Sequence, residues 1–261
     1  MSSVISVCRK SRETTYNLIL CLLGGVFWAA MIYDLFLSDA ASVAKVFSTL
    51  AFPLLIALFF FISALLFRAI AMGNMVLITE DQFPHLYEKI VAGAKKLNMP
   101  APEAFIFNSN GMFNAFARKA FGRKYLLLTS AIVDATTDEQ INFIIGHELG
   151  HHAAGHLNFW TYLLRFPATL IPFLYLAYSR QREYTCDRVG LYLSKDAKSS
   201  CEALQMLGCG CQKFNGKLNV ASFASQEKYV PKATGFITEI VRTHPRLTRR
   251  VIALENAKLA D

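Results

Sequence analysis

Four histidines and one glutamate lie close together in the stretch IIGHELGHHAAGH, residues 144–156. His147 and His151 are four positions apart, so on a helix their side chains project from the same face. Two imidazoles at this spacing can bind one metal ion, and Glu148 lies where its carboxylate can reach a water bound to that ion. The motif HExxH therefore predicts a zinc site with two protein ligands and a general base, rather than a cluster of solvated histidines.

A catalytic zinc site needs a third protein ligand and one open coordination position. In the stretch SRQREYTCDRVGLYL, which the pattern predicts as a helix, Glu183 and Asp187 are four positions apart. One of them can bind the metal while the other accepts a hydrogen bond from a ligating histidine. The alternative is an ordinary acidic face that pairs with Arg182 and Arg188.

A second histidine pair, His152 and His156, has the same spacing but lacks the intervening glutamate. On a helix it faces about 100° away from the first pair. The longer metzincin pattern fails, because the chain has Ala154 and Leu157 where that pattern needs glycine and histidine. We therefore expect His152 and His156 to lie on the surface or behind the metal ligands. His156 is the alternative third ligand if Glu183 does not bind the metal.

The order of four motifs gives a more specific indication. HExxH followed by ExxxD, with NAFA upstream and HPRLTRRV near the C-terminus, resembles the membrane metallopeptidase family of the bacterial protease HtpX. The type-one CAAX prenyl protease and the mitochondrial protease OMA belong with that family. The resemblance covers residues 75–258 and implies a zincin-like catalytic domain that holds one zinc ion per chain.

The resemblance also implies a role for each matching residue. The implied zinc ligands are His147, His151 and Glu183, with Glu148 as general base and acid and Asp187 as the support of a ligating histidine.

Two further motifs of the resemblance concern the substrate. The family's edge strand, which would pair with the backbone of an extended substrate, matches Asn114, Ala115, Phe116 and Ala117. In the late motif, either His244 or Arg250 could stabilise the tetrahedral oxyanion. A helix N-terminus with a structural arginine is the alternative, and Arg246 stands where the family usually has a second proline.

Two long apolar segments precede these motifs, in a chain that is 54% hydrophobic and only 18% charged. Residues 16–37 and 46–67 each have about the twenty residues that cross a bilayer core, although Asp34 lies near the end of the first. Buried core helices are the alternative. No small-residue cleavage site closes the first segment, so we expect a retained membrane hairpin over residues 1–72 rather than a signal peptide.

The basic residues indicate how this hairpin is oriented. Arg9, Lys10 and Arg12 precede the first segment, whereas the short connection carries only Lys45. The positive-inside rule therefore places the N-terminus and the catalytic domain in the cytoplasm, and the membrane is the inner or plasma membrane if the chain is bacterial. The chain has a net charge of +8, and residues 73–261, with 22 basic and 16 acidic residues, carry +6 of it, which suits a domain on an anionic membrane face. Nucleic acid is not an expected partner, because no basic stripe alternates with aromatic residues.

A third apolar run, residues 158–179, separates His151 from Glu183. One complete crossing would leave these two residues about 30 Å apart, on opposite sides of the bilayer. Arg165 and two prolines interrupt the run, so we expect it to turn back as a re-entrant hairpin, a buried helix or a lid.

The fold expected for residues 73–261 is α+β and mostly helical, with a small antiparallel sheet before the HExxH helix. Thr137 and Gln140 form a capping box that predicts where this helix begins. Six cysteines without a CxxC pair suggest reduced thiols in a cytoplasmic domain.

These patterns predict an integral-membrane zinc metalloendopeptidase whose partners are the lipid bilayer and polypeptide substrates. By resemblance, the substrates are misfolded membrane proteins and the role is membrane-protein quality control. The alternatives are a zinc-stabilised adaptor or chaperone without turnover, a CAAX-type processing protease, and a zinc hydrolase that acts on lipid or a small amide. A purely structural site would gain nothing from Glu148.

Overall fold

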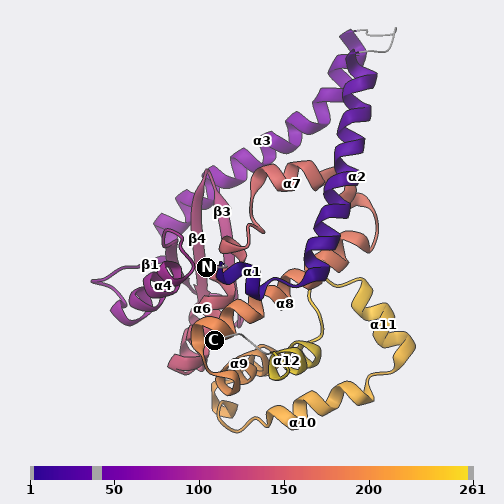
Figure 1. Ribbon diagram of the computed structural model, residues 1–261. Helices are drawn as coiled ribbons and strands as arrows, with labels where there is room; N and C mark the ends of the chain where they lie inside the picture. The colour runs from indigo at the N-terminus through magenta and orange to yellow at the C-terminus, as the bar shows by residue number, and fades with distance from the viewer. Residues whose placement is uncertain (1–2, 37–42, 258–261) are drawn as a thin grey trace.

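The computed structural model describes residues 3–36 and 43–257. Two long helices extend from a mostly helical domain that contains one small sheet (Figure 1). Three parts of the predicted segments lie outside the described residues: residues 1–2 and 37–42 of the predicted hairpin, which include the end of its first span, and residues 258–261 of the predicted catalytic domain. The expected α+β, mostly helical class with two apolar N-terminal helices is confirmed.

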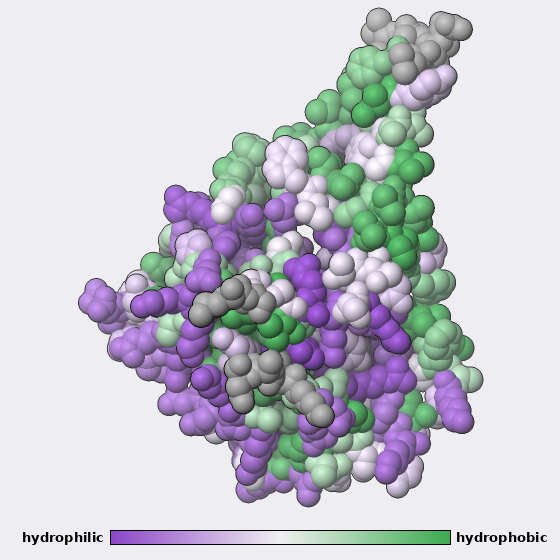
Figure 2. All heavy atoms as spheres, in the orientation of Figure 1, coloured by the Kyte–Doolittle hydropathy of each residue, from purple (hydrophilic) through white to green (hydrophobic). Residues whose placement is uncertain are grey.

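The two long helices are α2 (Ser11–Phe36) and α3 (Val43–Asn74), and a short helix, α1 (Val4–Cys8), precedes them. Within them, Ser11–Phe36 and Pro53–Asn74 are long and apolar enough to cross a membrane. Only a small part of either segment is buried inside the protein, unlike the core helix of a soluble domain. Hydrophobic side chains accordingly follow α2 and α3, whereas hydrophilic ones cover much of the domain (Figure 2).

The sheet has four strands in the order β1-β2-β4-β3, and it is mixed rather than antiparallel as expected. β3 and β4 form a hairpin in which β4 lies on the inner side, next to β2. β4 therefore runs parallel to β2, and β3 becomes an edge strand. The strands are β1 (Val76–Ile78), β2 (Glu103–Phe107), β3 (Ala115–Ala120) and β4 (Arg123–Thr129), with α4 (Pro84–Lys96) between β1 and β2.

Two helices pack side by side to form the centre of the domain, α6 (Asp138–Ala153) and α8 (Leu174–Ser194). α6 begins at the predicted capping box, in which the Thr137 side chain accepts a hydrogen bond from the Gln140 backbone. Glycines at the contact let the two backbones approach closely. A Cβ on Gly146 would lie 2.9 Å from the Gly190 Cα, so no larger residue fits there without movement.

The third apolar run does not form one membrane-length helix. It is divided into α7 (Phe159–Arg165), the 3₁₀ helix η1 (Phe166–Leu170) and the first turns of α8, and it packs against α2 (Figure 1). The buried Arg165 guanidinium donates hydrogen bonds of 2.6 Å to Asn17 Oδ1 and to the Tyr178 hydroxyl. The segment turns back toward the domain, and its entry into a bilayer stays a prediction.

The remaining helices complete the domain around α6 and α8. They are α5 (Ser130–Ala135), α9 (Ala197–Cys209), η2 (Gln212–Phe214), α10 (Val220–Ser225), η3 (Gln226–Tyr229), α11 (Lys232–Ile240) and α12 (Leu247–Glu255). The main core joins the sheet and α4 to α6, α8, α9 and α12. This core fixes α6 and α8, the two helices that carry the HExxH and ExxxD motifs.

Candidate active site

The HExxH and ExxxD motifs meet where α6 packs on α8. His147 Nε2 lies 3.4 Å from Glu183 Oε2, and His151 Nε2 lies 3.6 Å from Glu183 Oε1. All three residues are buried, and they line a cavity of about 650 Å³ that opens toward the surface. One carboxylate therefore faces the Nε2 atoms of both histidines, although Glu183 lies 32 positions after His151 in the sequence.

The other ring nitrogen of each histidine also has a partner. His147 Nδ1 lies 3.0 Å from Asp187 Oδ1, and His151 Nδ1 lies 3.1 Å from His156 Nδ1. Arg250 in turn donates two hydrogen bonds to Asp187, from Nε at 2.9 Å and from Nη2 at 2.6 Å. These contacts fix both imidazoles with their Nε2 atoms toward Glu183 and the cavity.

The electrostatics of the site favour positive charge between the two carboxylates. Burial opposes the protonated form of His147, but Asp187 and Glu183 outweigh it and raise its pKa to about 10. Burial also opposes the charged form of Glu183, yet the two histidines and Arg250 hold the pKa of that carboxyl well below its usual range. A site that gathers positive charge in this way suits a proton or a metal cation.

Glu148 lies beside these residues and lines the same cavity. It is 8% exposed, and burial raises the pKa of its carboxyl to about 7. The backbone N–H of Ala117 in β3 interacts with the carboxylate and opposes this shift. The catalytic helix and the edge strand are therefore in contact at the residue predicted to act as the base.

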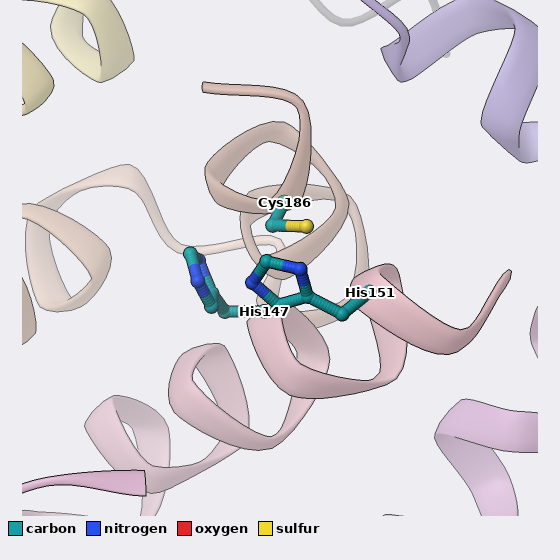
Figure 3. A group of neighbouring side chains, drawn as sticks. All are labelled: His147, His151 and Cys186. Carbon is teal, nitrogen blue, oxygen red and sulfur yellow. The ribbon is translucent and has the colours of Figure 1, made fainter. Parts of the chain in front are cut away.

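The donor set fits zinc, for which two imidazole nitrogens, one carboxylate and an open position are typical of catalytic sites. Cys186 is a second possible donor, since its Sγ and one ring nitrogen of each histidine lie within 4.8 Å of one another (Figure 3). Glu183 fits better, because its two oxygens face the two Nε2 atoms. Burial and the nearby Glu183 carboxylate keep the pKa of the Cys186 thiol well above its usual range.

The motif HPRLTRRV, residues 244–251, brings two side chains to the site. His244 Nε2 lies 3.7 Å from Glu183 Oε2, and its side chain is 62% exposed at the cavity. Arg250 is buried and engaged by Asp187, with its Nη1 atom 3.6 Å from Glu183 Oε2. Both residues line the cavity, but His244 is exposed there, whereas the guanidinium of Arg250 is bound to Asp187.

The segment Asn114, Ala115, Phe116 and Ala117 lies at the start of the edge strand, next to α6. Asn114 and Ala115 line the cavity. The Ala115 N–H donates to Asn114 Oδ1 at 2.9 Å, and the Ala117 N–H turns toward Glu148. Alternate amides of this segment therefore point to the cavity side of β3, where an added strand would pair.

His152 and His156 are both buried, so of the two expected positions the surface is wrong, and His156 lies behind His151, with 3.1 Å between their Nδ1 atoms. His152 Nε2 lies 2.9 Å from the Tyr125 carbonyl oxygen and ties α6 to β4, and burial lowers its pKa to about 4. Gly155, at a φ of 76°, lets the chain turn back so that His156 reaches His151. His156 also contacts Glu13 of α2, a residue that the sequence patterns did not single out.

A sequence model of the family described as peptidase family M48 matches residues 80–170 and 162–258 of the chain. The two matches together cover more than half of the chain. They include all four motifs, from NAFA to HPRLTRRV.

Two relatives share most of this region. The plastoglobule-localized metallopeptidase 48 of Arabidopsis thaliana is 27% identical over 176 residues, which cover 62% of this chain and 51% of that protein. A protease HtpX homolog from Polaromonas naphthalenivorans is 26% identical over 207 residues, which cover 63% of this chain and 68% of that protein. The chain thus spans about half the length of the Arabidopsis relative.

A solved structure shares the fold. The crystal structure of S. mikatae Ste24p matches with a TM-score of 0.56 and 16% sequence identity, over 94% of this chain and 67% of that chain. The expected resemblance to the HtpX-like and CAAX prenyl protease group is confirmed, and the chain belongs to peptidase family M48.

Proposed function

We propose that the chain is a zinc-dependent endopeptidase of a membrane. The observation that carries this proposal is the single Glu183 carboxylate facing His147 Nε2 and His151 Nε2, in a cavity that Glu148 also lines. Family membership supports the same reaction class. One zinc ion per chain is the proposed cofactor, held by the two histidines and Glu183.

The proposed chemistry divides between the metal and the chain. A zinc ion bound here supplies Lewis-acid polarisation of a peptide carbonyl and activation of water. Glu148 takes the proton of the attacking water at its carboxylate and returns it to the leaving amine nitrogen. Asp187 holds His147 in the tautomer that presents Nε2 to the site, and Arg250 keeps Asp187 charged and oriented.

His244 is the proposed oxyanion donor. It is exposed at the cavity, where the Thr243 hydroxyl lies 2.8 Å from its Nδ1 and leaves Nε2 on the side of Glu183, 3.7 Å from Oε2. A donor of this kind acts on charge that develops in the transition state. The engagement of Arg250 with Asp187 favours His244 over Arg250 for this role.

The proposed substrate is an extended polypeptide segment. The edge position of β3 and the cavity-side amides of Ala115 and Ala117 support its addition as a further strand. Main-chain hydrogen bonds of this kind give affinity with little dependence on side-chain sequence. Such a cleft suits misfolded or exposed segments of membrane proteins, and hence a role in quality control.

The proposed location is an integral membrane position, with α2 and α3 as the spanning helices and residues 73–261 as the catalytic domain. The apolar, exposed surfaces of α2 and α3 support it (Figure 2). The basic residues before α2 favour a cytoplasmic N-terminus and catalytic domain. The lipid bilayer is then the chain's constant partner.

The test compares wild type with Glu148→Gln, as full-length zinc-loaded protein in detergent, on casein and on a destabilised membrane protein. Glu148→Gln keeps the metal ligands but removes the base, so it should retain zinc and lose cleavage by several orders of magnitude. Equal cleavage by both proteins would refute the mechanism. A wild type that binds zinc without any cleavage would instead favour the adaptor or chaperone.

A further inference from the structure

A buried line of polar side chains connects the first membrane helix to the metal site. Glu13, in the first turn of α2, places Oε1 3.1 Å from His156 Nε2. His156 Nδ1 then lies 3.1 Å from His151 Nδ1, and His151 Nε2 faces Glu183. Glu13 is 1% exposed and His156 is 4% exposed, so solvent does not satisfy either group.

The protons in this line have one consistent arrangement. A neutral imidazole carries a single N–H, and His151 must leave Nε2 free if that atom is to bind a metal. The proton of His151 then lies on Nδ1 and is donated to His156 Nδ1. His156 in turn carries its proton on Nε2 and donates it to the Glu13 carboxylate.

Two neighbouring contacts do not change this arrangement. Cys186 Sγ lies 3.6 Å from His156 Nδ1, and a thiol is only a weak donor. The second Glu13 oxygen accepts a hydrogen bond from the Thr185 hydroxyl, and Arg9 Nη1 lies 3.6 Å from Oε1. Both partners favour a charged Glu13, the form that holds the His156 N–H most strongly.

We propose that Glu13 is a positioning residue for the metal ligand His151 and acts through His156. The proposal rests on the zinc site of the proposed function. Carboxylates that orient metal-binding histidines usually contact them directly. Here a second histidine lies between them, and the carboxylate is 143 residues away from that histidine in the chain. The consequence is that the metal site depends on the seating of the first membrane helix against α8.

A purely structural role for Glu13 makes a different prediction. Glu13 also joins α2 to Thr185 of α8, so its removal could lower stability without any effect on the metal. Properties of the bound metal distinguish the positioning role from the purely structural role. These are the zinc dissociation constant, measured by competition with a chromophoric chelator, and the visible spectrum of the Co²⁺-substituted protein.

The experiment uses full-length protein in detergent with Glu13→Leu, Glu13→Gln and the control Thr185→Val. Glu13→Leu leaves the His156 N–H without an acceptor and should weaken zinc binding about 10- to 100-fold and alter the Co²⁺ spectrum. Glu13→Gln keeps a neutral acceptor and should give a smaller effect in the same direction. Thr185→Val removes the other carboxylate contact and the acceptor of the Lys10 backbone N–H but leaves the contact of Glu13 with His156, so its zinc affinity and Co²⁺ spectrum should match wild type.

A second comparison tests the route through His156. If Glu13 acts through this residue, adding Glu13→Leu to His156→Leu should weaken zinc binding no further than His156→Leu alone. Additive losses would overturn the proposed route.

The positioning role of Glu13 is overturned if the Glu13 variants keep the wild-type zinc affinity and Co²⁺ spectrum. If Glu13→Leu does not fold, the same comparison with Glu13→Gln decides. Failure of the proposed function looks different, because wild type itself would then bind no zinc at this site or would bind zinc without cleaving a substrate. If wild type binds zinc and cleaves, and the Glu13 variants have the same zinc affinity and Co²⁺ spectrum as wild type, only the positioning role of Glu13 is refuted.

Discussion

His147 Nδ1 and Asp187 Oδ1 lie 3.0 Å apart in the core, although 40 residues separate them in the chain. Arg250 holds the other side of the same carboxylate with two hydrogen bonds. The imidazole therefore has its Nδ1 proton engaged and its Nε2 atom directed at Glu183. An ordered tautomer of this kind is what a metal ligand requires.

The first prediction concerns this contact. Asp187→Asn keeps the shape of the side chain but removes the charge that favours the Nδ1–H tautomer of His147. Zinc binding should weaken about 10- to 100-fold, measured by chelator competition. Asp196→Asn, at the start of α9, is the control, since it caps a helix far from the metal and should leave zinc affinity unchanged. Equal affinities of Asp187→Asn and wild type would contradict the assignment.

The second prediction separates the two arginines of α12. Arg250→Met removes the two hydrogen bonds of a buried ion pair and leaves the Asp187 charge with His147 alone, so the free energy of unfolding of the metal-free protein should fall by about 3–5 kcal/mol. Arg249→Met removes a half-exposed guanidinium that contacts Glu227 and Glu239, and it should cost about 1 kcal/mol or less. Chemical unfolding in detergent measures both. A similar loss of unfolding free energy in the two variants would show that the pair of Arg250 with Asp187 contributes no more than a surface ion pair.

The third prediction concerns His244. Its side chain is exposed at the cavity, so His244→Ala should leave zinc content and thermal stability unchanged. If it stabilises the oxyanion, kcat should fall about 10²- to 10³-fold while KM changes little. The measurement is steady-state cleavage of a fluorogenic peptide. A change confined to KM would place His244 in substrate binding instead.

The pH dependence of stability has a specific source in Glu227, on η3. Hydrogen bonds from Arg246, Thr248 and Arg249 lower the pKa of this carboxyl to about 2, against its ordinary 4.5. A depressed pKa stabilises the folded protein above pH 4.5, and that stabilisation is lost as the pH falls toward 2. The difference in thermal midpoint between metal-free wild type and Glu227→Gln should therefore be constant above pH 5 and shrink below pH 4. A difference independent of pH in this range would contradict the assignment.

Local patterns in the sequence predicted the helix that carries the motif and its start. Thr137 and Gln140 cap α6 as expected, and the spacing of His147 and His151 alone places them on one face. Such signals depend on residues within a few positions of one another. The pairing of these histidines with Glu183 came from resemblance, because spacing alone left an acidic surface face equally possible.

Other features depend on contacts between distant segments. The parallel pairing of β2 with β4 follows from the position of the β3–β4 hairpin, which no local pattern encodes. The contact of Glu13 with His156 depends on how α2 seats against α8. The sequence does contain one signal for the contact of Glu13 with His156. Glu13 is the only acidic residue in the first two turns of the apolar helix α2, where a charged side chain needs a partner.

The zinc content of Glu183→Ala decides whether Glu183 is the third zinc ligand, with Cys186→Ala as the matched control on the same helix. Each purified protein is loaded with zinc, passed through a desalting column and analysed by elemental mass spectrometry. Wild type and Cys186→Ala should each hold one zinc per chain, and Glu183→Ala should lose the metal. Retention of one zinc by Glu183→Ala, with loss in Cys186→Ala, would contradict the assignment of Glu183 and make the cysteine the third ligand.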